Sequence, residues 1–353
     1  MRAAVLEAHG EPLSIEDVSE PQLAPHGVIV SVEACGICRS DWHAWQGHHS
    51  WVGDRVDPGQ ILGHEPAGRV VEVGEQVSSL TAGDFVAIPF NLGDGTCPHC
   101  RRGRTNYCEN LSGLGFSMAV QGAWAEQVHV PYAEHNAIRL PDGVAAADVA
   151  ALGCRFMTAY NGLEHRADLG AGDWVAVHGC GGVGLSAIHV VDALGGRPIA
   201  VDIDPEALAL ADELGAEATV NAAEANAVPE VVRSIADGGV DIAVDALGIA
   251  ETCRNAIDCL GTRGTHLQLG LSTEAERGEI ALPTDVIAMQ GIDVLGSRGM
   301  PPVRYTELFG LIESGAIDPG ALVTQTVELD AVSDRLQAMT TYDTVGIEVI
   351  TTF

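Results

Sequence analysis

The sequence contains no lysine, and its 18 basic residues, all arginine, face 49 aspartates and glutamates. A formal net charge of −31 makes the surface repel phosphate backbones and anionic lipids, so we expect neither a nucleic-acid nor a membrane partner. The carboxylates are scattered among apolar patterns and not gathered in one block, which indicates an acidic folded surface. We interpret this surface as halophilic, because concentrated salt screens its self-repulsion, and we expect the protein to lose stability in low salt.

Long apolar runs are also missing. No segment approaches the roughly 20 apolar residues of a membrane helix, and the start "MRAAVLEAHGEPL" has no apolar core, so we expect no membrane helix and no signal peptide. The nine cysteines are unevenly clustered, which suits thiolate ligands in a reducing compartment better than a disulfide scaffold. Together these features predict a cytoplasmic protein.

At 353 residues the chain is long for one hydrophobic core, which predicts two domains. Roughly the first 150 residues show short alternating stretches punctuated by Gly, Pro and Asp, a pattern typical of β-rich structure. From Asp173 onward, short apolar runs alternate with helix-like segments and predict a doubly wound parallel sheet. The runs are "WVAVHG" at 174, "PIAVDI" at 198, "ATVN" at 218, "VDIAVDALG" at 240, "THLQLGL" at 265 and "IDVLGS" at 292. Beyond them, "RYTELFGLIESGAI" predicts a helix and "VGIEVI" a terminal strand.

A glycine-rich turn follows the first of these runs. In "GCGGVG", Gly179, Gly181 and Gly184 occupy the G-x-G-x-x-G positions, where small residues let the backbone approach a pyrophosphate at a helix N-terminus. The second run ends at Asp202, a carboxylate placed to hydrogen-bond the adenosine ribose diol. No basic residue follows closely that could pair with a 2′-phosphate, so we expect NAD to be preferred over NADP.

Potential metal ligands are concentrated in the first domain. The stretches "EACGICRSDWHAWQGHHSW" and "ILGHEPAG" supply Cys35, Cys38, Asp41, His43, His48, His49, His64 and Glu65. Cys35 and Cys38 alone would also suit a redox pair, and His48 and His49 are more simply interpreted as ordinary surface residues. A further stretch, "DGTCPHCRRGRTNYC", holds three cysteines, whereas a structural zinc normally takes four protein ligands.

Four ordered motifs, "CGICRSDWH", "GHEPAG", "LGCRFMTAY" and "VAVHGCGGVG", resemble those of the zinc-containing alcohol dehydrogenases of the medium-chain dehydrogenase/reductase superfamily. The resemblance covers essentially the whole chain and implies an α/β fold, with a Rossmann doubly wound parallel sheet domain and a β-rich GroES-like catalytic domain. It implies a catalytic domain of residues 1–153 completed by 296–353, and a Rossmann NAD-binding domain of residues 154–295. The active site is then expected in the cleft between the two domains.

The resemblance assigns the three protein ligands of a catalytic zinc to Cys38, His64 and Cys154, which leaves one open position for an alcohol oxygen. Cys35 is then not a ligand. Polyol and sugar dehydrogenases of this superfamily typically replace the third ligand by glutamate. Because this chain keeps Cys154, the resemblance favours an alcohol dehydrogenase.

Further site residues are implied by the same resemblance. Glu65 would approach the metal during ligand exchange, and Asp41 would hold the His64 ring through its other nitrogen. Ser40 and His43 would carry the alcohol proton out of a water-poor site. The cofactor-binding residues would be Thr158, Gly179, Gly181, Gly182, Val183, Gly184 and Asp202.

The three-cysteine stretch matches most of the structural zinc lobe of that family, which has the pattern C-x₂-C-x₂-C-x₇-C. Cys97, Cys100 and Cys108 occupy the last three ligand positions, and the spacing places Asp94 at the first. A carboxylate oxygen can coordinate zinc, so we expect Asp94 to replace the missing cysteine. His99 is an alternative ligand, although its position directly beside Cys100 makes simultaneous binding awkward.

These features predict a zinc-dependent alcohol dehydrogenase that transfers hydride reversibly between a primary or secondary alcohol and NAD through a zinc-bound alkoxide. The product would be an aldehyde or a ketone, and the family implies a homo-oligomer, either a tetramer or a dimer. Two alternatives stay open: a polyol or sugar dehydrogenase of the same superfamily, and a non-catalytic protein that binds zinc and nucleotide. Candidate apolar walls for the substrate are Trp42, Trp45, Trp51, Phe90 and Phe116.

Overall fold

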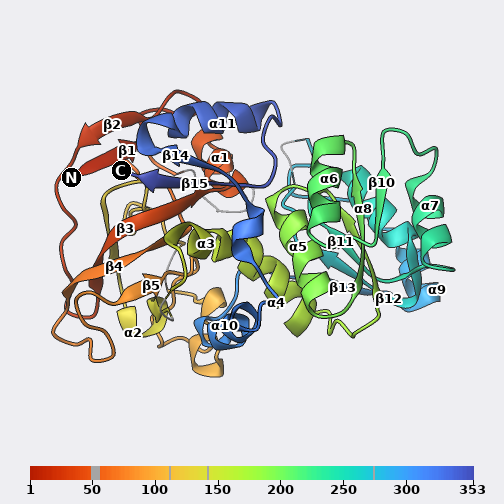
Figure 1. Ribbon diagram of the computed structural model, residues 1–353, viewed down its shortest axis with the longest axis horizontal. Coiled ribbons are helices and arrows are strands. Elements are labelled where there is room, and N and C mark those ends of the chain that lie inside the picture. Colours follow the sequence, from red (N-terminus) through yellow and green to blue (C-terminus); the bar gives the residue numbers. More distant parts are fainter. Residues whose placement is uncertain (49–55, 111–112, 141–142, 273–274) are drawn as a thin grey trace. The chain divides into compact units, whose positions relative to one another are not determined.

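The computed structural model describes residues 1–48, 56–110, 113–140, 143–272 and 275–353. The chain divides into two compact units (Figure 1). The first unit consists of Met1–Cys154, Gly299–Glu313 and Asp318–Phe353, and the second of Arg155–Arg298 and Ser314–Ile317. No helix among the described residues is long and apolar enough to cross a membrane.

The first unit is built on a seven-stranded sheet. Its main path runs β14-β15-β3-β4-β5-β7, and β6 pairs with β3 outside this path. A separate two-stranded sheet pairs β1 with β2. The strands of this unit are β1 (Arg2–Val5), β2 (Ser14–Asp17), β3 (Val28–Ile37), β4 (Pro66–Val73), β5 (Phe85–Ala87), β6 (Gln127–Val130), β7 (Ile138–Arg139), β14 (Val323–Glu328) and β15 (Ile347–Thr352).

Strand β3 is the centre of that sheet. It pairs antiparallel with β4, β6 and β15, and Ile350 of the C-terminal strand lies opposite Cys35. The strand that "VGIEVI" predicts is therefore present, and it joins the unit that holds the N-terminus. Because β3 is buried along most of its length, the residues that follow it start from a rigid position.

Helices of the first unit are short. The α-helices are α1 (Arg39–Gln46), α2 (Ala133–Asn136), α3 (Ala146–Ala151), α10 (Tyr305–Glu313) and α11 (Val332–Thr340), and the 3₁₀-helices are η1 (Cys100–Arg102), η2 (Thr105–Tyr107), η4 (Pro302–Arg304), η5 (Pro319–Leu322) and η6 (Leu329–Ala331). A π-helical segment, η3 (Leu152–Phe156), follows α3. Helix α1 packs against α11. Trp45 of α1 is buried in the hydrophobic core of this unit together with Trp124.

The second unit contains a six-stranded parallel sheet. Its strands are β8 (Trp174–His178), β9 (Arg197–Asp202), β10 (Ala218–Asn221), β11 (Val240–Asp245), β12 (Leu260–Gln268) and β13 (Asp293–Gly296). Their order, β10-β9-β8-β11-β12-β13, reverses direction at β8, which defines a doubly wound sheet. All six strands predicted from the apolar runs are thus confirmed, and so is their arrangement.

Helices of the second unit connect these strands. They are α4 (Met157–His165), α5 (Gly182–Ala193), α6 (Pro205–Glu213), α7 (Val228–Ile235), α8 (Ala250–Asp258) and α9 (Thr284–Gln290). Helix α5 packs against α6, and α7 packs against α8. Cys253 and Cys259 lie in the hydrophobic core beneath α8, and burial raises the pKa of each thiol, to about 11 and about 12.

Candidate functional site

Four potential metal ligands come together in the first unit. Cys38 follows β3 and caps α1, His64 and Glu65 directly precede β4, and Cys154 follows α3. One ligand atom from each of these side chains lies within 4.8 Å of those of the others. Glu65 can lie so close because residue 153 is glycine, where a Cβ atom would come within 2.6 Å of the Glu65 side chain.

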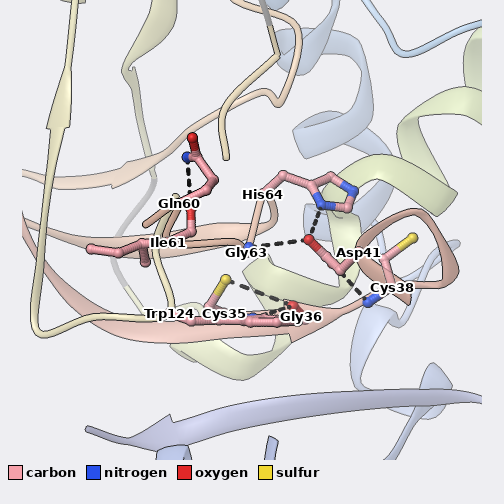
Figure 2. Close-up of polar contacts among 9 residues, drawn as sticks. All are labelled: Cys35, Gly36, Cys38, Asp41, Gln60, Ile61, Gly63, His64 and Trp124. Carbon is pink, nitrogen blue, oxygen red and sulfur yellow. Dashed lines mark hydrogen bonds and ion pairs between the residues drawn. The ribbon is translucent and has the colours of Figure 1, made fainter. Parts of the chain in front are cut away.

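Asp41 orients two members of this cluster (Figure 2). Its Oδ1 atom accepts hydrogen bonds from His64 Nδ1 at 2.7 Å and from Gly63 N at 3.1 Å, and its Oδ2 atom accepts one from Cys38 N at 3.1 Å. The Asp41 and His64 side chains are both fully buried. In the neutral His64 ring, Nδ1 donates to Asp41 and the lone pair is on Nε2, which is buried and has no hydrogen-bond partner in the described part of the chain.

The chemistry of this cluster fits zinc. A buried imidazole nitrogen without a partner calls for a ligand, and two thiols with one imidazole form a donor set that zinc prefers. Burial lowers the pKa of His64, but Asp41 and Cys38 outweigh that effect and raise the pKa well above its ordinary value. The site therefore favours a positive charge at His64, carried either by a proton on Nε2 or by a divalent cation that takes the place of this proton.

Cys35 takes no part in the cluster. Its side chain is fully buried in the hydrophobic core, and its sulfur lies 3.7 Å from the carbonyl oxygen of Gly36. In Figure 2 the sulfurs of Cys35 and Cys38 lie apart, on either side of Asp41 in this view. The arrangement does not support a redox pair between the two cysteines.

A second group of potential ligands lies in the same unit, around η1 and η2. One ligand atom each of Asp94, Cys97, Cys100 and Cys108 lies within 4.8 Å of those of the others. The Oδ1 atom of Asp94 is 3.4 Å from the Cys108 sulfur and 3.7 Å from the Cys100 sulfur. Hydrogen bonds from backbone N–H groups, that of Cys100 first, lower the pKa of Cys97 to about 7 and favour its thiolate.

Neighbouring side chains hold the Asp94 carboxylate in place. Its Oδ2 atom accepts hydrogen bonds from Thr96 Oγ1 at 2.5 Å and Asn110 Nδ2 at 2.7 Å, and Thr96 N donates to Oδ1 at 2.9 Å. Oδ1 is thereby directed toward the sulfurs. His99, the alternative ligand, lies outside the group, and its Nε2 atom is 3.4 Å from Glu109 instead.

The glycine loop lies at the end of β8 in the second unit. Gly181 caps α5, so the backbone N–H groups of Gly182, Val183 and Gly184 belong to the first turn of that helix. A Cβ atom at Gly184 would lie 1.8 Å from the carbonyl oxygen of Gly179, so any larger residue would push the loop away from the helix. The loop also sits beside β11, where the strand order reverses and ligands of open parallel sheets bind.

Asp202 ends β9, and its carboxylate is tied to the glycine loop. Oδ2 accepts a hydrogen bond from Cys180 N at 2.5 Å, and Oδ1 accepts from Ile203 N at 2.7 Å and Asp204 N at 2.9 Å. These backbone donors fix the orientation of the carboxylate. Oδ1 thereby uses both of its lone pairs, whereas Oδ2 retains one for a further donor such as a ribose hydroxyl.

Comparison with known proteins identifies the family. Residues 24–142 match the family described as alcohol dehydrogenase GroES-like domain, and residues 182–314 match that described as zinc-binding dehydrogenase. An NAD-dependent alcohol dehydrogenase of Sulfurisphaera tokodaii is 30% identical to this chain over 99% of both sequences. The chain belongs to the zinc-containing alcohol dehydrogenases. The resemblance inferred from the four motifs is thereby confirmed.

Solved structures agree with this family assignment. An alcohol dehydrogenase from Thermus sp. ATN1 has a TM-score of 0.90 and 31% identity, with 100% of both chains covered. An alcohol dehydrogenase from Aeropyrum pernix has a TM-score of 0.88 and 30% identity, and covers 99% of this chain and 100% of its own. The predicted fold class, with a Rossmann domain and a GroES-like domain, is confirmed for this dehydrogenase.

Helix α1 of the dehydrogenase carries the two residues expected to move a proton. Ser40 is half-buried in its first turn, and His43 is almost fully buried one turn later. The Nδ1 atom of His43 lies 2.9 Å from Nδ1 of His48. The interpretation of His48 as an ordinary surface residue was therefore wrong, whereas His49 lies outside the described residues.

The candidate apolar walls differ in their positions. The rings of Phe90 and Phe116 lie 5.6 Å and 4.8 Å from the His64 ring, so both flank the first cluster of the dehydrogenase. Trp45 is buried in the core and donates to the Glu11 carbonyl oxygen, which makes it a structural residue. Trp42 packs beside His43 and His48, and Trp51 lies outside the described residues.

Thr158 lies on α4, and Arg155 lies in the η3 segment that precedes it. Thr158 is buried, and its carbonyl oxygen accepts a hydrogen bond from Ser297 Oγ at 3.1 Å. Arg155 is also buried, and its Cδ atom would lie 2.5 Å from a Cβ atom at Gly182. Nothing in the residue pattern indicates that this arginine lies against the start of α5, because the two residues belong to separate motifs.

Proposed function

We propose that this dehydrogenase transfers hydride reversibly between a primary or secondary alcohol and NAD, giving an aldehyde or a ketone. The cluster of buried Cys38 and His64 with half-buried Cys154 carries the proposal, because the Nε2 atom of His64 lacks a hydrogen-bond partner among the described residues and Asp41 fixes the ring. Three protein ligands are the set used by catalytic zinc sites, which keep a position open for substrate. Relatives of the chain are named alcohol dehydrogenases, and one is named as NAD-dependent.

Cys38, His64 and Cys154 would hold the zinc ion, which when bound acts as a Lewis acid that lowers the pKa of an alcohol. Asp41 keeps the His64 imidazole in the tautomer that leaves Nε2 available. Phe90 and Phe116 border the site with apolar surface, which suits the alkyl part of an alcohol better than the hydroxyls of a sugar.

Ser40 and His43 are assigned to proton removal, and Glu65 to ligand exchange at the metal. Burial, followed by the charges of His48 and Arg39, lowers the pKa of His43 to about 4. The ring is therefore neutral at pH 7 and has one nitrogen that can accept a proton. This protonation state is the one that alcohol oxidation requires.

NAD is assigned to the glycine loop of the second unit. The N–H groups of Gly182, Val183 and Gly184 at the N-terminus of α5 would bind the diphosphate, with Gly179 and Gly181 shaping the loop. Asp202 would accept hydrogen bonds from the adenosine ribose hydroxyls, and its charge would repel a 2′-phosphate. We place Thr158 beside the nicotinamide ring, as the family resemblance implies.

The substitution Asp202→Gly tests the cofactor assignment. We expect the Kd for NAD to rise roughly 10- to 100-fold, because hydrogen bonds to a charged group are lost, while NADP binds relatively better. Titration of both cofactors by protein fluorescence measures the change. Glu213→Gln is a matched control, since it removes one exposed negative charge from the helix that follows Asp202. An unchanged ratio of NAD to NADP affinity in Asp202→Gly would contradict the ribose contact.

The reaction itself is tested by a substrate panel in high salt. Primary and secondary alcohols, aldehydes, ketones and sugars are assayed with NAD and with NADP. We expect alcohols to be oxidised with NAD. Faster oxidation of glucose or sorbitol than of simple alcohols would assign the chain to the polyol dehydrogenases. Binding of NAD without turnover of any substrate would reject a catalytic role.

A second, structural zinc is proposed at Asp94, Cys97, Cys100 and Cys108. The short distances between these four side chains support it, and so does the orientation of the Asp94 carboxylate by Thr96. With four protein ligands this site leaves no position for substrate, so its role would be to stabilise the lobe around η1 and η2.

We also propose that the dehydrogenase forms a homo-oligomer, a tetramer or a dimer. Strand β13 is an edge strand of the six-stranded sheet, and Val294 on it is 42% exposed. Met289 on the neighbouring helix α9 is 86% exposed. An apolar sheet edge in contact with water favours self-association. A mass equal to one chain in light scattering would contradict this proposal.

A further inference from the structure

Two histidines of the first unit form a direct imidazole pair. His43 Nδ1 and His48 Nδ1 lie 2.9 Å apart, and the ring centroids are 5.2 Å apart with an interplanar angle of 55°. His43 is 9% exposed, whereas His48 is half-buried. The pair therefore leads from a buried ring toward the protein surface.

The chain is shaped to make this contact. Helix α1 ends at Gln46, and Gly47 takes a left-handed conformation with φ 75°. The turn brings His48 N within 3.0 Å of the carbonyl oxygen of His43, so the backbone also pairs these two residues. A residue other than glycine at position 47 would be strained, and its Cβ atom would come within 2.8 Å of the His9 ring.

Trp42 holds both rings from one side. Its ring meets those of His43 and His48 edge-on, at centroid distances of 4.9 Å and 5.3 Å. The indole N–H donates to Thr340 Oγ1 of α11 at 2.9 Å, and the Arg39 guanidinium lies 4.2 Å from the ring. Trp42 is itself held by these two contacts, so it restricts the movement of the imidazole pair on this side.

We propose that His48 is the outer station of the proton relay, a positioning and proton-accepting residue that acts through His43. The inference rests on the proposed function, in which His43 receives the alcohol proton. A hydrogen bond between two Nδ1 atoms requires one donor and one acceptor, and in the relay His43 is the donor, with its Nδ1–H directed to Nδ1 of His48 and its own lone pair on Nε2.

The number of protons is conserved in this transfer. When a proton reaches Nε2 of His43, the proton on its Nδ1 moves to Nδ1 of His48, and His48 releases its Nε2 proton to water or buffer. His43 is left with its proton on Nε2, and rotation or reverse exchange restores the starting tautomers. No oxidant or other reactant is needed, because only N–H bonds break and form.

The charges around His43 favour this direction of transfer. Burial disfavours a positive charge on His43, the His48 ring and the Arg39 guanidinium disfavour it further, and the Cys38 sulfur opposes them to a smaller extent. A cation on His43 is therefore short-lived, whereas His48 is closer to solvent. The proton leaves the buried ring for the more exposed one.

Substitution of His48 by Gln tests the relay. At neutral pH in dilute buffer we expect kcat for alcohol oxidation to fall roughly tenfold, because a positioned proton acceptor is lost. The KM for alcohol and the Kd for NAD should stay unchanged. Added MOPS, a buffer that coordinates zinc weakly, should restore the rate of the variant without accelerating the parent enzyme. His129→Gln, at another partly buried histidine of the same unit, should keep the parental rate.

A second readout does not depend on turnover. In His48→Gln the pKa of His43, followed by ¹⁵N NMR of the imidazoles, should rise, because the neighbouring ring that lowers it is gone. A fall in kcat that buffer does not rescue, or that comes with weaker NAD binding, would show a merely structural role and overturn the inference. An unchanged kcat would overturn it as well.

The variant His43→Gln distinguishes a failure of the relay proposal from a failure of the proposed function. If His43→Gln slows alcohol oxidation while His48→Gln keeps the parental rate, the role proposed for His48 is wrong and the proposed function stands. If His43→Gln also matches the parent, the assignment of His43 in the proposed function is wrong.

Discussion

Cys38→Ser is expected to abolish alcohol oxidation, with kcat at least about a thousandfold lower, while NAD binding stays within about twofold of the parent. Removing one thiolate from the three-ligand set weakens the metal site, and a Lewis acid contributes several kcal/mol to the reaction, where each 1.36 kcal/mol is a factor of ten. The glycine loop and Asp202 lie in the other unit and are untouched. Stopped-flow assays, NAD titration and metal analysis measure the three quantities.

Cys35→Ser is the matched control for this prediction. Cys35 lies on β3, three positions before Cys38, and is also buried, but its sulfur lies outside the cluster. We expect Cys35→Ser to lose some stability, because a hydroxyl replaces a buried thiol, and to keep both its zinc content and its turnover. Parental alcohol oxidation by Cys38→Ser would show that the catalytic zinc is assigned to the wrong residues.

Asp94→Ala is expected to reduce the zinc content from two ions per chain to one and to lower the Tm by several degrees. Structural zinc contributes folding free energy directly. A loss of about 3 kcal/mol is a modest share of the zinc-binding free energy of a typical structural site. The remaining turnover per active site should equal that of the parent, because the lobe around η1 and η2 is separate from the Cys38 cluster. Mass spectrometry under native conditions and thermal unfolding test both statements.

Two companion variants refine the result. Asp94→Cys should hold the second zinc more firmly against a chelator, since thiolate is a softer ligand than carboxylate. His99→Gln should retain both zinc ions, because its ring faces Glu109 and not the sulfurs. One zinc per chain in the parent protein, lost in Cys38→Ser, would mean that the Asp94 lobe is metal-free.

Much of the fold follows from local patterns. Six continuous apolar runs separated by helices specify a parallel sheet, because strands covered on both faces need no alternation. The assignment of Asp94 follows from residue spacing, because the four ligands of a short lobe must be spaced so that they can bind the same metal ion. In each case the information lies within a few consecutive residues.

Other features depend on contacts that spacing does not encode. His48 reaches His43 because Gly47 turns the chain back, and a glycine in the sequence does not reveal its φ angle. Trp45 and Phe116 look alike as apolar aromatics, yet one fills the core and the other flanks His64. The burial of Arg155 against Gly182 joins two motifs whose separation in the chain hides their contact.

Asp41 joins two separate segments of the site. Its hydrogen bonds to His64 and Gly63 on one side and to Cys38 on the other are made by protein groups alone. These bonds need no metal, so they restrain two of the three ligands and reduce the conformational entropy that is lost when a cation binds. We therefore expect loss of the metal to be reversible, because the ligands can bind a new ion without refolding of the chain.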